Sequence, residues 1–337
     1  MKLIVTIPAY NEAANIADVI AEVPRAIVGV DAVEVLVVDD GSTDGTVETA
    51  LAAGADHVVR LGRNRGLATA FRTAMREAVR RGADLIVNTD GDNHYDQSRI
   101  PDLIQPLLRR QADIAVGSRV LGGLRMRAAN KYGNRVANAI MQRLLGMPGV
   151  DVSTGFRAYT REAALKLNVL SNHTYTHETL IHALDQQLAI ANVPLPARAV
   201  DRPSRLIRSL TSHIWRAGIV IMNSFILYRP LHVWGTLGLV CALLGTLPFV
   251  RFLYFVAQGQ GHGHIQSLVI GSALLFFGVQ LCIVGLLASA IRWNRRLIEE
   301  VLYVLKERDG EQRAATNGHA TTNGTHQDDT RRKANVV

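Results

Sequence analysis

The residues best suited to chemistry lie in the segment from Ala83 to Asp96, ADLIVNTDGDNHYD. Its apolar run, Leu85 to Val87, is typical of a buried strand, and the strand is expected to end at Thr89-Asp90-Gly91-Asp92. Ligands of open α/β sheets bind beyond the carboxyl ends of the strands. Two carboxylates spaced as Asp-x-Asp can point at one hard cation, and the glycine between them lets a ligand approach the backbone. A solvated Asp-Gly turn is the alternative interpretation.

The composition narrows the class of partner. The chain has 337 residues, enough for one large domain with additions or for two domains, and a net charge of +8. A basic chain favours an anionic partner: nucleic acid, a phosphorylated ligand or a membrane surface. Aromatic residues make up only 6% of the chain, which argues against a base-stacking surface, so we expect no nucleic acid partner. Cys241 and Cys282 lie inside apolar runs and are interpreted as small hydrophobic residues.

The elements that must position the two carboxylates alternate along the first part of the chain. Apolar runs predict strands at 2–7, 33–38, 57–61, 85–87 and 113–116, and helical periodicity predicts helices at 12–23, 47–53, 67–79 and 100–109. This alternation predicts a doubly wound, mostly parallel α/β sheet. Pro8, Asp39 and Asp90 follow three of the strands and are therefore expected at one shared crevice.

The last third of the chain has a different character. No Lys, Arg, Asp or Glu occurs between Leu231 and Val250, nor between Phe252 and Ile291. Because about 20 apolar residues span a bilayer, 231–291 is predicted to form two transmembrane helices joined by a loop at 258–264. The outer flanks are basic, with Arg229 on one side and Arg292 on the other. The positive-inside rule therefore predicts an integral membrane protein whose N-terminal domain and C-terminus are cytoplasmic.

Five regions follow from these patterns. Residues 1–204 are expected to form the cytosolic α/β domain, and 231–291 the two transmembrane helices. Residues 205–228 predict a basic amphipathic helix at the membrane surface, with an ordinary helix packed on the domain as the alternative. Residues 292–307 predict a second membrane-surface helix. Residues 308–337 are too polar to bury enough apolar area and are expected to be disordered.

Several motifs together resemble a known family. Pro8-Ala9-Tyr10-Asn11-Glu12, Val37 to Thr46 (VVDDGSTDGT) and Asp90-Gly91-Asp92 resemble the family 2 glycosyltransferases with the GT-A fold. Gly117-Ser118-Arg119, Asp151-x-x-x-Gly155-Phe156-Arg157 and Arg202-x-Ser204-Arg205, followed by two C-terminal spans, are similar to the polyprenyl-phosphate subgroup, which includes dolichol-phosphate mannose synthases and undecaprenyl-phosphate glucosyltransferases. The resemblance covers about 3–305. It implies inverting transfer of a hexose from a nucleotide-sugar, of the GDP-mannose or UDP-glucose type, to a polyprenyl phosphate.

The resemblance also implies a donor site. It assigns donor binding to Pro8, Tyr10, Glu12, Asp39, Asp40, Asp90 and Gly91. Tyr10 would flank the base, and Asp39 or Asp40 would accept hydrogen bonds from the base or ribose; helix capping is the alternative for these two aspartates. Asp90 and the catalytic Asp92 would face the diphosphate through Mg²⁺ or Mn²⁺. The cation is needed because a pocket lined by carboxylates would otherwise repel a diphosphate.

His94 departs from the family pattern. Relatives often carry a glutamine at this position, where it helps to bind the metal ion. An imidazole suits Mn²⁺ better than Mg²⁺, so His94 is interpreted either as a metal ligand that biases the choice of ion or as a solvated loop residue.

The acceptor side is mainly basic. The resemblance implies that the lipid phosphate is bound by Arg119, Lys131, Arg135, Arg157, Arg202, Ser204 and Arg205. Guanidinium groups bind phosphate through two hydrogen bonds. We expect Arg119 and Arg135 to act catalytically at the reacting phosphate, and Arg202, Ser204 and Arg205 to lie at the edge of the bilayer. A phosphate monoester has a second pKa of about 6, so a dedicated general base is not required.

Two other functions remain open from the sequence. The same donor site could serve a lipid hydroxyl, as in diacylglycerol or ceramide, and this would require a general base, with Glu178 or Asp151 as the candidates. A catalytically silent membrane protein that binds a nucleotide-sugar is the other alternative. The sequence leaves open the sugar, the base, the lipid length and the oligomeric state, a homo-oligomer included.

Overall fold

The computed structural model describes residues 1–119, 150–169, 175–195, 230–258 and 265–333, with the backbone alone described beyond residue 308. The chain divides into two units, one made of residues 1–214 and 300–337 and the other of residues 215–299. The expected helix at 205–228 lies outside the described residues.

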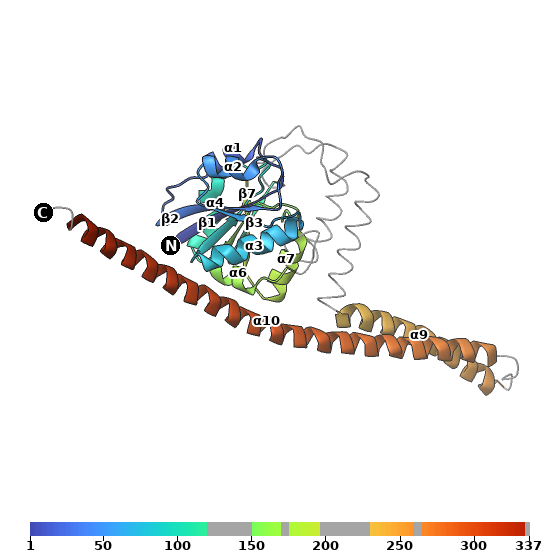
Figure 1. Cartoon of the computed structure of the whole chain (residues 1–337). Coiled ribbons are helices and arrows are strands. Elements are labelled where there is room, and N and C mark those ends of the chain that lie inside the picture. The colour runs from blue at the N-terminus through green and yellow to red at the C-terminus, as the bar shows by residue number, and fades with distance from the viewer. Residues whose placement is uncertain (120–149, 170–174, 196–229, 259–264, 334–337) are drawn as a thin grey trace. The chain divides into compact units, whose positions relative to one another are not determined.

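The first unit is built on an α/β sheet whose elements are labelled in Figure 1. Its strands are β1 (Lys2–Ala9), β2 (Ala32–Asp39), β3 (His57–Arg60), β4 (Leu85–Asn88), β5 (Ile114–Ser118), β6 (Arg157–Thr160) and β7 (Ile190–Pro194). Its helices are α1 (Ile16–Ala21), α2 (Thr46–Ala52), α3 (Leu67–Arg80), a 3₁₀ turn η1 (Gln97–Arg99), α4 (Ile100–Leu108), α6 (Arg161–Lys166) and α7 (Thr176–Asp185). The strands and helices predicted before residue 118 are all present, with ends shifted by a few residues.

Within the described residues, the seven strands form one sheet in the order β3-β2-β1-β4-β6-β5-β7. β1 pairs in parallel with both β2 and β4, so the chain order reverses at β1. A reversal of this kind opens a crevice at the carboxyl ends of the strands. β6 is antiparallel to β4 and β5, so the residues before β6 reach the same edge of the sheet as the residues after β4 and β5. The predicted mostly parallel, doubly wound fold is confirmed.

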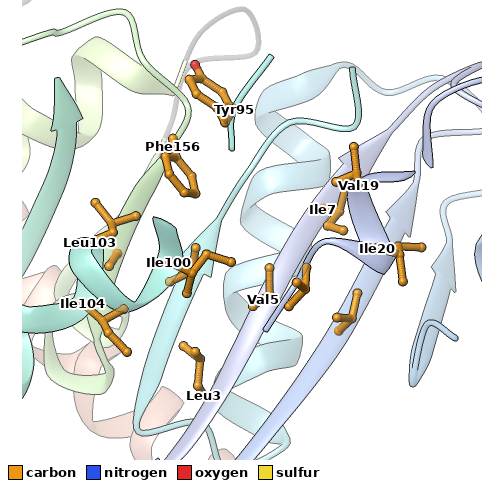
Figure 2. Close-up of a cluster of buried hydrophobic side chains, with 14 of the residues drawn as sticks. Leu3, Val5, Ile7, Val19, Ile20, Tyr95, Ile100, Leu103, Ile104 and Phe156 are labelled. Carbon is orange, nitrogen blue, oxygen red and sulfur yellow. The ribbon is translucent and has the colours of Figure 1, made fainter. Parts of the chain in front are cut away.

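Alternating residues of the strands fill two apolar layers. Leu3, Val5 and Ile7 of β1 are completely buried and point to the face covered by α1 and α4. Figure 2 shows them between Val19 and Ile20 of α1 and a second group, made of Phe156, just before β6, and three residues of α4: Ile100, Leu103 and Ile104. Ile4 is equally buried on the opposite face, where α3 packs against β1 and β2. Burial of both faces explains why these strands read as continuous apolar runs.

The second unit contains two long apolar helices. α9 (Pro230–Ala257) and the first part of α10 (Ile265–Lys333) are both long and apolar enough to cross a membrane, with mean hydropathies of 2.0 and 2.4 in their most apolar windows. Most of their large apolar side chains are exposed to the surroundings. Such a surface is stable in a lipid environment, so these two helices suggest membrane anchoring.

Glycines form the contact between α9 and α10. A Cβ added to Gly278 would lie 2.6 Å from the backbone nitrogen of Ala242 and 2.7 Å from the carbonyl oxygen of Gly238. A Cβ at Gly245 would lie 2.6 Å from the nitrogen of Leu275. The backbones therefore approach more closely than any other residue would permit, as is common where membrane helices pack.

The C-terminal segment differs from the expectation. Residues 308–333 were expected to be disordered, but α10 continues through them as helix to Lys333. The segment contains no proline, but its three glycines and five threonines favour a helix poorly, so the composition does not account for the helical course.

Candidate active site

Two loops at the carboxyl edge of the sheet are joined by hydrogen bonds between backbone and side chains. The N–H of Asn11, after β1, donates to Ser42 Oγ at 2.9 Å, and the N–H of Thr43 donates to Asn11 Oδ1 at 2.9 Å. The N–H of Glu12 donates to Thr46 Oγ1 at 3.0 Å. Asn11 has a φ of 54°, a conformation that asparagine tolerates better than most residues. Together these bonds fix one wall of the crevice, where Tyr10 is 41% exposed and free to meet a ligand.

Asp39 and Asp40, predicted to bind the donor, are both 97% buried and hold the local backbone. Asp39 accepts a hydrogen bond from the N–H of Ser42 and so closes the turn after β2. Asp40 accepts from the N–H of Arg65 at 2.7 Å and from the N–H of Gly66 at 2.9 Å, at the start of α3. The helix-capping interpretation therefore describes the contacts of Asp40 in this structure.

Asp90 and Asp92 follow β4, as predicted, and both keep partial exposure at the carboxyl edge. Burial, and after it the charge of Asp92, raises the pKa of Asp90 to about 7. The positive charge of Arg119 acts in the opposite direction and lowers the pKa of Asp90. Two carboxylates that repel each other in a partly buried pocket favour a cation between them.

His94 lies against Asp92. Its Nδ1 is 3.1 Å from Asp92 Oδ2, and its backbone N–H donates to Asp92 Oδ1 at 3.2 Å. The hydrogen bond to Asp92 raises the pKa of His94. In the part of the chain that the structure describes, no three His, Cys, Asp or Glu side chains are grouped so that they could hold a metal ion. The role of Asp90, Asp92 and His94 as a set of metal ligands therefore stays a prediction, and His94 contacts Asp92 in this structure.

A buried polar network that the sequence did not indicate lies beneath Asp90. Asn88 Nδ2 donates to the carbonyl oxygen of Gly155 and to the hydroxyl of Tyr175, each at 2.9 Å. A Cβ added to Gly155 would lie 2.7 Å from both carboxylate oxygens of Asp90 and 2.8 Å from the Tyr175 hydroxyl. Gly155 is therefore the residue that makes room for the Asp90 carboxylate. Its place in the motif Asp151-x-x-x-Gly155 was the only sequence indication of this role.

Tyr95 supports the same loop from the other side. Its hydroxyl accepts a hydrogen bond from the N–H of Gly155 at 3.0 Å, and its ring stacks on Phe156 with centroids 5.2 Å apart. Burial, and after it the charge of Asp90, raises the pKa of Tyr95 to about 12. Tyr95 is thus a neutral hydroxyl at physiological pH, and it fixes Gly155 against Asp90.

Arg119 extends from the carboxyl end of β5 and is held by the loop before β6. Its Nε donates to Asp151 Oδ2 at 2.7 Å, and its Nη2 donates to Asp151 Oδ1 at 3.2 Å and to Ser153 Oγ at 2.8 Å. The Arg119 side chain is 17% exposed and that of Asp151 only 2%. The expected role of Arg119 at the acceptor phosphate stays a prediction; the structure shows that Asp151 and Ser153 hold its guanidinium.

Arg157 was predicted to bind the acceptor phosphate, but it is completely buried. Its Nη1 donates to the carbonyl oxygen of Thr176 and to Thr179 Oγ1, each at 2.7 Å, and its Nη2 donates to the carbonyl oxygen of Val152 at 3.0 Å. These bonds connect the start of β6 to α7. The expectation was wrong because this arginine satisfies protein carbonyls in the interior and does not face the crevice.

The other residues expected at the acceptor side lie outside the described residues: Lys131, Arg135, Arg202, Ser204 and Arg205.

The chain is similar to known proteins both in sequence and in fold. The model of the family described as Glycosyl transferase family 2 matches residues 4–167. The chain is 30% identical to glycosyltransferase AglJ of Haloferax volcanii over 314 residues, which cover 87% of this chain and 96% of the relative. It is 28% identical to the undecaprenyl-phosphate mannosyltransferase of Micrococcus luteus, over 60% of this chain and 85% of the relative.

Solved structures resemble the fold as well. Glucosyl-3-phosphoglycerate synthase from Mycobacterium tuberculosis, in complex with Mn²⁺, UDP and phosphoglyceric acid, has a TM-score of 0.53 and 26% identity, covering 66% of this chain and 78% of that one. A second structure of the synthase contains Mg²⁺ and UDP, with a TM-score of 0.51 and 25% identity over 65% of this chain and 78% of that one.

Proposed function

Because the chain belongs to glycosyl transferase family 2, we propose that it transfers a hexose from a nucleotide-sugar to a polyprenyl phosphate, with inversion at the anomeric carbon. The relative from Micrococcus luteus is named for transfer to undecaprenyl phosphate, and this supports the proposed acceptor class. The observation that carries the proposal is the loop before β6, where Gly155 borders the Asp90 carboxylate and Asp151 holds the guanidinium of Arg119.

The aspartate pair fits a divalent cation. Mg²⁺ is commonly bound by one or two carboxylates, with substrate phosphates and water filling the other positions, so two protein ligands suffice. Asp90 and Asp92 would hold the ion, which would offset both the burial and the charge of Asp92 that raise the pKa of Asp90 to about 7. When bound, Mg²⁺ or Mn²⁺ neutralises the charge that develops on the leaving nucleoside diphosphate.

The chemistry on the acceptor side needs no general base. A phosphate monoester has a second pKa of about 6 and is largely a dianion at neutral pH. Its oxygen attacks the anomeric carbon, a new carbon–oxygen bond forms, and the bond to the diphosphate breaks, with no proton to remove. Arg119 would bind and orient this phosphate. We propose the same role for the other acceptor residues assigned from sequence, four of them basic and one a serine: Lys131, Arg135, Arg202, Arg205 and Ser204.

The two apolar helices would hold the enzyme at the bilayer in which its acceptor is dissolved. Arg229 precedes the first helix, and Arg292, Arg295 and Arg296 follow the most apolar part of the second. By the positive-inside rule, we propose that the catalytic domain and the C-terminus face the cytoplasm, where nucleotide-sugars are made.

The test is a product assay with the purified full-length protein in detergent. Undecaprenyl phosphate and diacylglycerol are supplied together with Mn²⁺ and a panel of nucleotide-sugars, and lipid products are weighed by mass spectrometry. We expect one donor to give a lipid phosphate heavier by one hexose residue, and Asp92→Asn to abolish it. Asp102→Asn is the matched control, because Asp102 forms an exposed ion pair with Arg99. Transfer to diacylglycerol instead, or no product with any donor, would overturn the proposal.

A further inference from the structure

The hydrogen bonds of Asp151 argue against a role as general base. Both of its carboxylate oxygens face Arg119, at 2.7 Å from Nε and 3.2 Å from Nη2. Oδ1 also accepts from the hydroxyl of Ser153 at 2.8 Å and from its backbone N–H at 3.2 Å. A residue with 2% exposure and both oxygens occupied in this way is poorly placed to take a proton from a substrate.

The charge of Asp151 is also fixed by its surroundings. Burial opposes its ionisation, but the hydrogen bonds and charge of Arg119 outweigh burial and hold the pKa of Asp151 below its ordinary value. A carboxylate with a lowered pKa is a weak base. The same two bonds that make Asp151 a weak base hold the guanidinium plane of Arg119 in one orientation.

Asp151 and Ser153 engage only part of the Arg119 guanidinium. Within the ranges that the structure describes, Nη1 of Arg119 has no hydrogen-bond partner, whereas Nε and Nη2 are both engaged. Nη1 is therefore the nitrogen of Arg119 that can donate a hydrogen bond to a ligand. The loop before β6 that holds Arg119 through Asp151 also contains Gly155, whose Cβ position would lie 2.7 Å from the Asp90 carboxylate oxygens, so this loop borders the aspartate pair.

We propose that Asp151, supported by Ser153, is the positioning residue of Arg119. It fixes the guanidinium beside the aspartate pair, so that Arg119 is already oriented when a phosphate monoester binds. The proposal rests on the function proposed above. It removes Asp151 as the general base that a lipid hydroxyl acceptor would need.

A double-mutant cycle tests the proposal. The variants Asp151→Asn, Arg119→Ala and the double variant are compared with the wild type by kcat/KM for undecaprenyl phosphate. We expect Arg119→Ala to lower this value by about 100-fold, because a truncated buried charge pair costs that much. We expect Asp151→Asn to lower it by about tenfold or more, mainly through a higher KM for the acceptor, with the donor KM unchanged.

The decisive comparison is between the two backgrounds. If Asp151 acts only through Arg119, adding Asp151→Asn to Arg119→Ala changes kcat/KM by less than about twofold, as expected for residues that form one unit. If Asp151 is a base, the loss has the same size in both backgrounds, falls on kcat and removes the acidic limb of the pH profile; that result overturns the proposal. Asp102→Asn again serves as the control for the substitution. Ser153→Ala, which removes the hydroxyl that accepts from Arg119 and donates to Asp151, replaces Asp151→Asn if the latter does not fold.

A binding measurement separates this proposal from the proposed function. The same variants are titrated with geranyl phosphate in the absence of a nucleotide-sugar. Weaker binding by both Arg119→Ala and Asp151→Asn, with no further loss in the double variant, supports the positioning role even if the wild type transfers no sugar. Equal binding by all four proteins overturns it.

Discussion

At the residue scale, the account depends on the space that Gly155 leaves for Asp90. Gly155→Ala would place a methyl group 2.7 Å from the Asp90 carboxylate oxygens and must displace them. We expect turnover to fall by about 100-fold, because a displacement of about 1 Å in a catalytic group can cost that much. The assay is the rate of lipid-linked sugar formation, with thermal unfolding as the control for folding. Wild-type turnover in a folded Gly155→Ala protein would show that the position of Asp90 is unimportant.

The ion pair of Asp151 predicts a pH dependence of stability. The folded pKa of Asp151 lies below its ordinary value of 3.8, so the pair stabilises the fold at neutral pH. This contribution is lost as the pH falls from about 4 through the folded pKa, because the unfolded chain then binds the proton first. We expect unfolding temperatures measured from pH 7 to pH 3 to fall more steeply for the wild type than for Asp151→Asn. Parallel curves for the two proteins would contradict the assignment.

Sequence reasoning recognised some site residues and missed others for physical reasons. Asp90 and Asp92 were predicted because a strand end can be located from the apolar run before it. Asn88 and Tyr175 were not, because their importance arises from a contact between segments 87 residues apart. Arg157 was assigned to the acceptor phosphate because it belongs to a motif of the resemblance and arginine binds phosphate, whereas three protein oxygens accept its hydrogen bonds in the interior.

At the element scale, the carboxyl ends of β1, β2 and β4 determine where the site lies. The periodicity of the first part of the chain predicted these strands because each is buried on both faces. The antiparallel insertion of β6 between β4 and β5 was not predicted, since four residues with one charge carry no distinctive pattern. That insertion is what brings Asp151 and Gly155 to Arg119 and Asp90.

The glycine contact between α9 and α10 leads to a prediction of its own. Gly278→Ala would force the two backbones apart, because its Cβ would lie 2.6 Å from Ala242 N. We expect a loss of about 1–3 kcal/mol in the stability of the helix pair, measured by thermal unfolding of the full-length protein in detergent. Gly235→Ala is the matched control, because its Cβ would meet only the Leu231 side chain at an ordinary 3.6 Å. Equal unfolding temperatures for the two variants would argue against a close glycine contact.

At the scale of the whole molecule, a family 2 glycosyltransferase domain is joined to two helices long and apolar enough for a membrane. The sequence predicted both parts, because each has a strong pattern: alternating strands and helices, then about 60 residues with a single charge between Leu231 and Ile291. The helical course of 308–333 was not predicted, since polar composition excludes a core but does not exclude a single helix. This combination suits an enzyme whose donor is dissolved in water and whose acceptor is dissolved in lipid.

The most direct test of the account is the initial rate of sugar transfer to undecaprenyl phosphate by the wild-type protein, before and after exhaustive chelation of divalent cations. If Asp90 and Asp92 hold the ion that balances the diphosphate, chelation lowers the rate by at least about 100-fold, and Mn²⁺ or Mg²⁺ restores it. An unchanged rate after chelation would contradict the account.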